Sequence, residues 1–359
     1  MSLPDISAER RKGRAAATNP GSRFDRLQAE AVDDGWERDE DQPPLRTEVS
    51  VERPRKVITR NSSPDVGFER SINPYRGCEH GCIYCFARPT HAYLGLSPGL
   101  DFETRLVARP EAPARLAREL SATSYLPKVI AIGTNTDPYQ PIEREHRIMR
   151  GILEVLSEFR HPVGIVTKGT LIERDIDILG EMAAAGLTRV GISVTTLERD
   201  LARRLEPRVP SPARRLKAIE RLAKAGVEVR VMASPMVPGL TDMELERILE
   251  AARDAGAVAA SWIMLRLPHE VSPLFRDWLE THYPDRAARV MARVREAHGG
   301  RDYDPEWGRR MRGQGQYAEL IAARFRVAVK RLGLTHDLPP LRTDLFRVPP
   351  RPGDQLELF

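Results

Sequence analysis

Two short apolar runs, residues 163–169 (VGIVTKG) and 188–196 (TRVGISVTT), decide the fold class of this chain. Each run is too short and too continuously apolar for a surface helix, but each suits a parallel strand that is buried on both faces. Runs of the same kind occur at residues 128–133, 227–236 and 257–267. A strand, a crossover helix and the next strand therefore recur about every 30 residues, which is the length of one βαβ unit.

Amphipathic segments lie between these runs and predict the crossover helices. With a first strand expected near Ser71–Arg76, the chain should contain six strand–helix units. This number is short of a complete eight-unit barrel. It fits either of two α/β folds, an open, partial (β/α)6 barrel or a doubly wound sheet. Three groups of residues form the predicted helix faces: Ile148, Ile152, Leu156 and Phe159; Leu216, Ile219 and Leu222; and Leu245, Ile248, Leu249 and Ala252.

In both folds the reactive side chains lie in the loops that follow the carboxyl ends of the strands. Polar or cysteine-containing segments stand at five such positions, so we expect them to converge on one rim of the sheet. These segments are the three cysteines, residues 133–140, Lys168, residues 193–196 and residues 234–239.

The composition divides the chain into four parts. Residues 1–62 are rich in charged residues, Pro and Ser and lack a sustained apolar period, so we expect a largely disordered N-terminal arm there. The strand–helix core should span residues 63–300, a basic helical extension residues 301–347, and a flexible tail residues 348–359. In the extension, a helix over 317–332 is predicted to have an apolar face of Leu320, Ile321, Phe325 and Val329.

The overall composition is that of a soluble globular protein, because 41% of the 359 residues are hydrophobic and 30% are charged. No apolar run approaches the roughly 18 residues that a membrane helix needs. The first 14 residues are charged and lack the apolar centre of a secretion signal. We therefore expect the protein in the cytoplasm.

All three cysteines of the chain, Cys78, Cys82 and Cys85, lie in one short glycine-punctuated segment. This crowding argues against a disulfide framework and for shared coordination in a reducing compartment. The spacing C-x3-C-x2-C suits three corners of a 4Fe-4S cluster, and the chain has no fourth cysteine for the remaining iron. One iron would then stay open to an exogenous ligand, which is what chemistry at the cluster requires.

Two simpler interpretations of the cysteines stay open at this point. Buried cysteines can be inert packing residues. A structural zinc site is the other alternative, with His80 or His91 as the fourth ligand.

The segment Cys-x3-Cys-x-aromatic-Cys after a first strand, followed by βα repeats, resembles the radical S-adenosylmethionine superfamily over about residues 63–300. The resemblance implies a partial TIM-like (β/α)6 barrel and a 4Fe-4S cluster on Cys78, Cys82 and Cys85. It also implies that S-adenosyl-L-methionine binds the open iron. Reductive cleavage of this cofactor gives a 5′-deoxyadenosyl radical that abstracts hydrogen from a substrate. An electron donor such as flavodoxin or ferredoxin is a further implied partner.

The resemblance also assigns residues to the cofactor. Tyr84 would lie against the adenine. Thr134, Asn135 and Asp137 stand where the superfamily usually has a Gly-Gly-Glu-like motif that grips the methionyl ammonium. This sequence departs from that motif, but it offers hydroxyl, amide and carboxylate acceptors. Asp137 could instead cap the helix that follows.

Two later strands supply the remaining candidates. Lys168, in the sequence Thr167-Lys168-Gly169, would pair with the methionyl carboxylate. Ser193 and Thr195 would bond either that carboxylate or the ribose hydroxyls. Ordinary loop polarity is the alternative for all three residues.

Within the superfamily, the segments 133–143 (GTNTDPYQPIE), 166–169 (VTKG) and 192–207 (ISVTTLERDLARRLEP) are most similar to the branch of spore photoproduct lyase. That enzyme reverses a methylene-bridged thymine dimer in DNA and returns hydrogen from a cysteine outside the cluster. This chain has no such cysteine, so we do not expect identical lesion reversal unless the donor is a tyrosine such as Tyr84, Tyr93 or Tyr139.

The distribution of charge points to nucleic acid. Residues 286–351 contain fifteen Lys and Arg but only seven Asp and Glu, a net charge of +8 in a chain whose total is +5. Such a region attracts phosphates, although a basic face can also be simply solvated. The arginines suited to phosphate are Arg309, Arg310, Arg312, Arg324 and Arg326.

The last five residues, QLELF, resemble the Gln-Leu-x-Leu-Phe peptide with which bacterial polymerases and repair proteins dock on the DNA sliding clamp. Leu356, Leu358 and Phe359, together with Gln355, would enter a hydrophobic groove. Packing of this peptide back onto the core is the alternative.

Together these features predict a radical S-adenosylmethionine enzyme, of a possible lyase type, that acts on nucleic acid in DNA repair or base modification. Two alternatives stay open. One is a radical enzyme that modifies RNA, a peptide or a small metabolite. The other is a non-catalytic, zinc-stabilised nucleic-acid-binding protein.

Overall fold

A computed structural model describes residues 11–25 and 44–350. Within these ranges no helix is long and apolar enough to cross a membrane. The strands are β1 (Glu48–Val51), β2 (Thr59–Arg60), β3 (Arg70–Ile72), β4 (Tyr75–Arg76), β5 (Arg105–Ala108), β6 (Ile130–Ile132), β7 (Val163–Thr167), β8 (Thr188–Ser193), β9 (Val229–Met236) and β10 (Ala259–Met264). The α-helices are α1 (Asp101–Thr104), α2 (Ala112–Leu120), α3 (Glu143–His146), α4 (Ile148–Glu158), α5 (Ile176–Ala184), α6 (Arg199–Leu205), α7 (Pro212–Lys224), α8 (Leu245–Asp254), α9 (Val271–His282), α10 (Pro284–Ala297) and α11 (Gly315–Leu332). Three 3-10 helices are η1 (Arg88–Leu94), η2 (Thr170–Asp175) and η3 (Asp242–Glu244).

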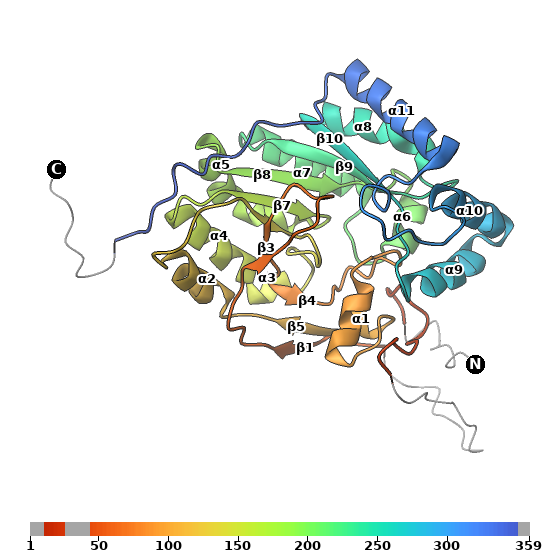
Figure 1. Cartoon of the computed structure of the whole chain (residues 1–359), viewed down its shortest axis with the longest axis horizontal. Coiled ribbons are helices and arrows are strands. Elements are labelled where there is room, and N and C mark those ends of the chain that lie inside the picture. Colours follow the sequence, from red (N-terminus) through yellow and green to blue (C-terminus); the bar gives the residue numbers. More distant parts are fainter. Residues whose placement is uncertain (1–10, 26–43, 351–359) are drawn as a thin grey trace.

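A seven-stranded sheet forms the centre of the molecule, in the order β10-β9-β8-β7-β6-β3-β2 (Figure 1). The strands from β3 to β10 in this sheet pair in parallel and follow one another in chain order. Strand β2 pairs antiparallel with β3 at the edge. Because the strand order has no reversal point, the sheet is not doubly wound, and the predicted partial (β/α)6 architecture is confirmed.

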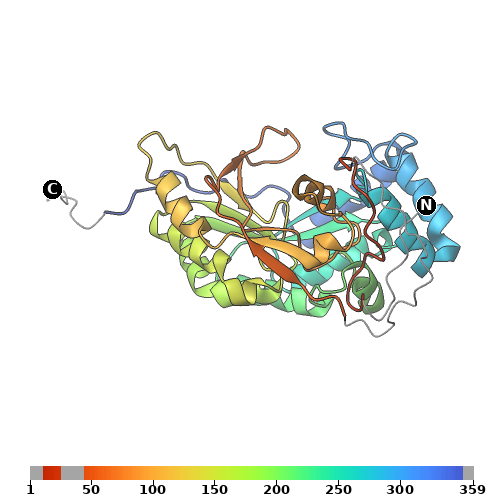
Figure 2. The ribbon, with the colours of Figure 1, turned by 90° about the horizontal axis from the view of Figure 1, so that it is seen from below.

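The crossover helices pack along one side of the sheet, and long loops rise on the other (Figure 2). Right-handed crossovers between successive parallel strands place the helices on the same face. The predicted apolar faces of α4, α7 and α8 lie in the core, where Ile152, Ile219 and Ile248 are completely buried. The helical layer thus fixes the strands, and the loops after the strands remain available for a site.

The predicted first strand, Ser71–Arg76, is in fact two strands in two sheets. Strand β3 pairs with β6 in the main sheet, whereas β4 pairs antiparallel with β5 in a small sheet of order β1-β5-β4. Pro74 between them has no backbone N–H, so one continuous ladder cannot run through it. The cysteine loop consequently begins at the small sheet.

The described parts of the N-terminal arm are docked on the core, which corrects the expectation of disorder for those residues. Strand β1 pairs in parallel with β5, and Val57 is buried. The backbone N–H groups of Ala15 and Ala16 each donate to the carboxylate of Glu103 over 3.0 Å. These segments bind mainly through backbone hydrogen bonds and small side chains, so they show no amphipathic period in the sequence.

The C-terminal extension contains one long helix, α11, followed by an extended segment that runs back along the molecule (Figure 1). Ile321 and Phe325 of α11 are buried as predicted, but Leu320 is 52% exposed and does not belong to the packed face. The buried stripe continues through Ala328 and Leu332, one residue out of register with Leu320. The peptide Gln355–Phe359 lies outside the described residues.

Candidate functional site

The three cysteines lie in the loop between β4 and η1, at the carboxyl end of the parallel sheet. Cys78 and Cys82 are buried and Cys85 is half-buried. Gly77 and Gly81 have positive φ angles of 72° and 65°, a conformation that side chains with a Cβ rarely adopt. A Cβ on Gly81 would also come within 2.5 Å of the Glu103 carboxylate. The glycines therefore allow the tight path that brings three thiols onto one short loop.

Arg88 fixes the inner side of this loop. Its guanidinium is fully buried and donates to the carbonyl oxygens of Cys82 and Gly81, both over 3.0 Å. It also pairs with the buried carboxylate of Glu103 at 2.6 Å. Since Glu103 also accepts the two N–H groups of the N-terminal segment, one ion pair connects that segment to the cysteine loop. Neither Arg88 nor Glu103 belongs to a recognisable motif, so neither could be identified from the sequence.

The loop after β6 holds the cysteine loop from another side. The side chain of Gln140 accepts from the N–H of Glu79 over 2.8 Å and donates to the carbonyl of Gly77 over 3.2 Å. It is completely buried. The segment 133–140 is thus part of the same site as the cysteines, as its position after a strand predicts.

Asp137 is the centre of the hydrogen bonds between these loops. Its carboxylate accepts from the hydroxyl of Thr167, from the N–H of Lys168 over 2.7 Å and from the N–H of Tyr139 over 2.9 Å. It also lies 3.3 Å from Nδ1 of His80. Burial acts to raise the pKa of Asp137, but His80 and the two neighbouring donors hold it below its ordinary value. With its oxygens engaged in this way, Asp137 ties together the loops after β4, β6 and β7.

Lys168 extends from the end of β7 towards the cysteine loop. Its Nζ lies 5.8 Å from the centroid of the Tyr84 ring and 3.9 Å from Oε1 of Glu206. Its positive charge acts to lower the pKa values of Cys82 and Cys85. The predicted cation is therefore near the thiols.

Tyr84 and Thr195 meet at a buried carboxylate that the sequence analysis missed. Both hydroxyls bond Oε1 of Glu206, with 2.7 Å from Thr195. Oε2 of Glu206 accepts from the buried guanidinium of Arg215 over 2.8 Å. Burial acts to raise the pKa of Glu206, but Arg215 and Lys168 keep it below its ordinary value. Burial and Glu206 together raise the pKa of the Tyr84 hydroxyl.

Glu206 could have been found from the sequence, because it lies within the segment 192–207 that carries the resemblance. The segment alone does not indicate that this carboxylate, at the end of α6, lies close to the end of β8. Ser193 is buried at the end of that strand, and its carbonyl oxygen accepts from Arg215 over 2.9 Å.

Thr134 and Asn135 differ from the other candidates. Both are half-buried after β6, and their side chains form no hydrogen bond with the described part of the chain. Their polar groups are therefore free for a ligand. This distinguishes them from Asp137, whose partners are internal.

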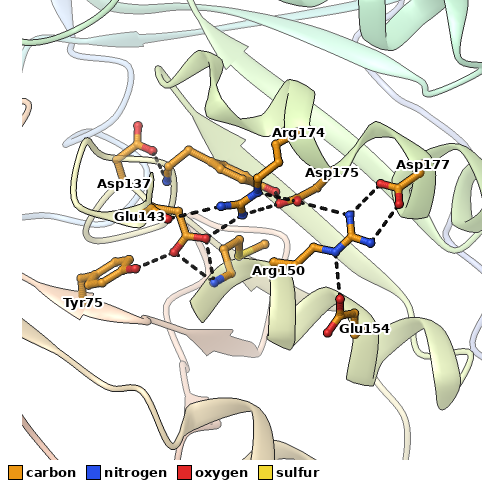
Figure 3. Close-up of polar contacts among 10 residues, drawn as sticks. Tyr75, Asp137, Glu143, Arg150, Glu154, Arg174, Asp175 and Asp177 are labelled. Carbon is orange, nitrogen blue, oxygen red and sulfur yellow. Dashed lines mark hydrogen bonds and ion pairs between the residues drawn. The ribbon is translucent and has the colours of Figure 1, made fainter. Parts of the chain in front are cut away.

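A second polar cluster lies behind the loop after β6 (Figure 3). Glu143 accepts from Tyr75 and from Arg174, the latter over 2.7 Å, and is completely buried. Arg174 also bonds Asp175, which accepts the hydroxyl of Tyr139 over 3.1 Å. Because every one of these groups has an internal partner, the cluster supports the rim and does not form a second site.

Burial raises the pKa values of Cys78, Cys82 and Cys85 above the ordinary value of a thiol. Among the described residues, no three His, Cys, Asp or Glu side chains converge as ligands of a single metal ion. Of the histidines considered for zinc, His80 faces Asp137, and Nε2 of His91 lies 2.9 Å from the carbonyl oxygen of Arg105.

The predicted phosphate-binding arginines are largely engaged within the protein. Arg324 makes two hydrogen bonds to Glu246, and Arg310 pairs with Asp65. Arg312 donates to the carbonyl of Trp262 over 3.1 Å. Arg309 is paired with Glu306 at the surface, and Arg326 is exposed without a contact in the described ranges. Four of these five arginines thus have partners among the described residues, and phosphate binding by the set stays a prediction.

Comparison with known proteins places this site in a family. Residues 72–252 match the model of the Radical SAM superfamily. A protein of Mycobacterium tuberculosis that is described as uncharacterized is 35% identical over 79% of this chain and 80% of its own length. An uncharacterized protein of Methanocaldococcus jannaschii is 26% identical over 67% of this chain and 85% of its own length.

The fold is similar to solved structures of spore photoproduct lyase. A variant of that enzyme superposes with a TM-score of 0.56 at 18% identity, covering 80% of each chain. The enzyme complexed with dinucleoside spore photoproduct gives a TM-score of 0.55 at 18% identity, covering 80% of this chain and 81% of that one.

Proposed function

Because the chain belongs to the Radical SAM superfamily, it is an enzyme, and we propose that its substrate is a nucleic acid. Enzymes of this superfamily use a 4Fe-4S cluster and S-adenosyl-L-methionine. When the cluster and this cofactor are bound, reductive cleavage of the sulfonium supplies a 5′-deoxyadenosyl radical that takes hydrogen from the substrate. Membership as an enzyme removes the non-catalytic zinc protein from the alternatives.

The residues at the rim fit these two groups. Cys78, Cys82 and Cys85 would hold three irons, because one short loop carries all three thiols. Four protein ligands are not available from cysteine alone, which leaves one iron for the methionyl group.

Some of the polar candidate residues would contact the cofactor, and others would hold those residues in position. We propose that Thr134 and Asn135, whose side chains have no internal partner, contact the methionyl group. Lys168 would pair with its carboxylate, and the Tyr84 ring would lie beside the adenine. Ser193 and Thr195 stay candidates for the ribose side.

Asp137 and Glu206 would act indirectly. The oxygens of both carboxylates already interact with groups of the protein. We propose that these contacts hold Lys168 and Tyr84 in position.

The observation that supports a nucleic acid is the fold similarity over 80% of this chain to an enzyme solved with a dinucleoside lesion. DNA repair or base modification is the reaction class that we favour. RNA, a peptide or a small metabolite stays the alternative. Since all three cysteines are in the loop, hydrogen return by another cysteine of this chain is not available, and the reaction would differ from lesion reversal at that step.

The test is turnover of S-adenosyl-L-methionine by anaerobically purified, reduced protein with four additions. These are undamaged DNA, ultraviolet-damaged DNA, RNA and buffer alone. The proposal predicts that formation of 5′-deoxyadenosine is stimulated by DNA. Stimulation only by RNA would move the substrate to the first alternative. Equal rates with every nucleic acid and with buffer would contradict the proposal.

We also propose two partners. A flavodoxin or ferredoxin would supply the electron, and the terminal Gln355–Phe359 peptide would dock on the DNA sliding clamp in the cytoplasm. Removing these five residues should abolish binding to purified clamp and leave turnover with free DNA unchanged. Undiminished clamp binding by the shortened chain would exclude this docking mode.

A further inference from the structure

Arg266 lies on the outer side of the cysteine loop and has no acceptor of its own. It follows the end of β10 by two residues, on the same rim as the cysteines. Its guanidinium carbon is 4.3 Å from the centroid of the Phe86 ring, and Phe86 is the residue directly after Cys85. The Arg266 side chain is half-buried, yet it makes no hydrogen bond or ion pair with the described part of the chain.

The backbone around Arg266 is firmly held, so the side chain does not reach this position by chance mobility. Leu265 and Leu267 on either side are buried. The N–H of Leu265 donates to the carbonyl of Met236 over 3.0 Å, and its own carbonyl lies 2.8 Å from Nε2 of His298. Arg266 is therefore presented from a rigid strand end.

Among the described residues, no carboxylate is bonded directly to Arg266. Asp65 is the acidic neighbour, but it accepts from Arg310 and from the N–H of Gly308. Burial lowers the pKa of Arg266, and the charge of Arg310 acts in the same direction. The guanidinium groups of Arg266 and Arg310 thus lie near the single carboxylate of Asp65, which leaves an excess of positive charge around Arg266.

The ring beside Arg266 is unusual for its exposure. Phe86 is 43% exposed although it directly follows the half-buried Cys85 and packs against a guanidinium. An exposed aromatic face beside an unpaired arginine matches the two needs of a nucleotide, a surface for the base and a charge for the phosphate. An uncharged metabolite would not use the arginine.

We propose that Arg266 binds a backbone phosphate of the nucleic-acid substrate while Phe86 contacts the adjoining base. The inference rests on the proposed function and defines where the substrate enters, on the β10 side of the cysteine loop. A planar guanidinium can donate two parallel hydrogen bonds to a phosphate. The same contact would bring the neighbouring nucleotide to the rim where the radical chemistry occurs.

The test measures binding to the cluster-loaded enzyme with two labelled single-stranded DNA hexamers. One has ordinary phosphodiesters, and the other has uncharged methylphosphonates at its central linkages. A hydrogen bond to a charged group contributes about 1.5–3 kcal/mol, so Arg266→Ala should weaken binding of the first hexamer about 10- to 100-fold. It should change binding of the second less than about 3-fold, because the charge that Arg266 would contact is absent.

Two further variants sharpen the result. Arg266→Lys keeps the charge but loses the planar fork, so it should lie between the wild type and the alanine variant. Arg253→Ala is the matched control, because Arg253 is an arginine near the carboxyl end of α8, on the opposite rim. It should bind both hexamers like the wild type. Unchanged iron content and thermal midpoint show that each variant is folded.

The outcomes separate this inference from the proposed function. If DNA stimulates the wild type but Arg266→Ala loses no affinity, or loses it equally for both hexamers, the assignment of Arg266 is overturned and the proposed function stands. A higher KM for S-adenosyl-L-methionine with unchanged hexamer binding would also overturn it. If the wild type binds neither hexamer and no nucleic acid stimulates turnover, both are overturned.

Discussion

The two sides of the cysteine loop contrast in how their arginines are used. On the inner side, Arg88 is fully buried and each arm of its guanidinium meets a carbonyl or the carboxylate of Glu103. On the outer side, Arg266 is half-buried and packs on the face of Phe86, without a hydrogen bond or ion pair in the described ranges. The same side chain therefore holds the loop on one side and is left available on the other.

Positioning residues and binding residues at this rim can be distinguished by whether their polar groups have partners within the protein. A buried polar group whose partners are all internal stabilises the fold, and removing it leaves those partners unpaired. A polar group that is held rigidly but has no partner lowers the stability of the fold and stabilises no other group. We therefore expect such a group to bind a ligand. Asp137 and Glu206 belong to the first class, and Thr134, Asn135 and Arg266 to the second.

The largest effect is expected when one thiol of the cysteine loop is removed. Cys82→Ala should reduce bound iron and lower the formation of 5′-deoxyadenosine to the background of the assay, since the cluster would lose one of its three thiols. Iron content and product are measured after anaerobic purification. Met264→Leu, in the core near the rim, should retain both. Full turnover by the cysteine variant would contradict the ligand assignment.

The next test compares the two arginines directly. Arg88→Met removes the partner of the fully buried Glu103, and breaking a buried ion pair costs about 3–5 kcal/mol of unfolding free energy. Arg266→Met breaks no ion pair in the described ranges and should cost less than about 1 kcal/mol. Urea unfolding of both variants gives the difference. Equal losses would mean that Arg266 also has a structural role.

Glu206 provides a smaller test of the same idea. Glu206→Gln keeps the shape but removes the charge that faces Arg215 and Lys168, so it should cost roughly 1–3 kcal/mol. Glu246→Gln is a control at a more exposed ion pair with Arg324 and should cost less than about 1 kcal/mol. Denaturant unfolding checks both. A larger loss in the control would contradict the importance given to the buried carboxylate.

The smallest expected effect concerns His161, a buried histidine with a lowered pKa. Its Nε2 lies 2.7 Å from the Tyr125 hydroxyl, and burial lowers its pKa to about 4 from 6.5. Between these two values the unfolded chain binds a proton that the folded chain does not, so stability falls as the pH drops from 6.5 towards 4. Between pH 7 and 5 this group should account for a loss of about 1–2 kcal/mol.

The measurement is urea unfolding at pH 7 and 5 for the wild type and His161→Phe. The variant should be less stable at pH 7, because it loses two hydrogen bonds, but its stability should fall less on acidification. An equal fall in both proteins would contradict the assignment of this pH dependence to His161.

Much of the fold could be predicted from the sequence because buried parallel strands have a continuous apolar pattern. The five central runs all contain strands, and three predicted helix faces are in the core. The pattern could not show that Pro74 divides the first strand between two sheets. It also could not show that the N-terminal segment docks by backbone hydrogen bonds, since these carry no side-chain signature.

For the candidate site, the sequence was enough to predict that the cysteines and the surrounding strand ends lie together. Lys168, Tyr84 and Thr195 do lie together at one rim. What stayed hidden is which charges pair with which. Arg88, Glu103 and Arg215 were missed because their buried ion pairs leave no recognisable pattern in the sequence.

The most direct test of the account is the yield of 5′-deoxyadenosine from reduced, iron-loaded protein in the presence and absence of DNA. The account predicts about four irons per chain, cleavage of S-adenosyl-L-methionine, and a higher rate when DNA is added. Protein that binds iron and cleaves the cofactor at one rate regardless of DNA would contradict DNA as the substrate. Protein that holds no iron and forms no 5′-deoxyadenosine would contradict the assignment of the three cysteines.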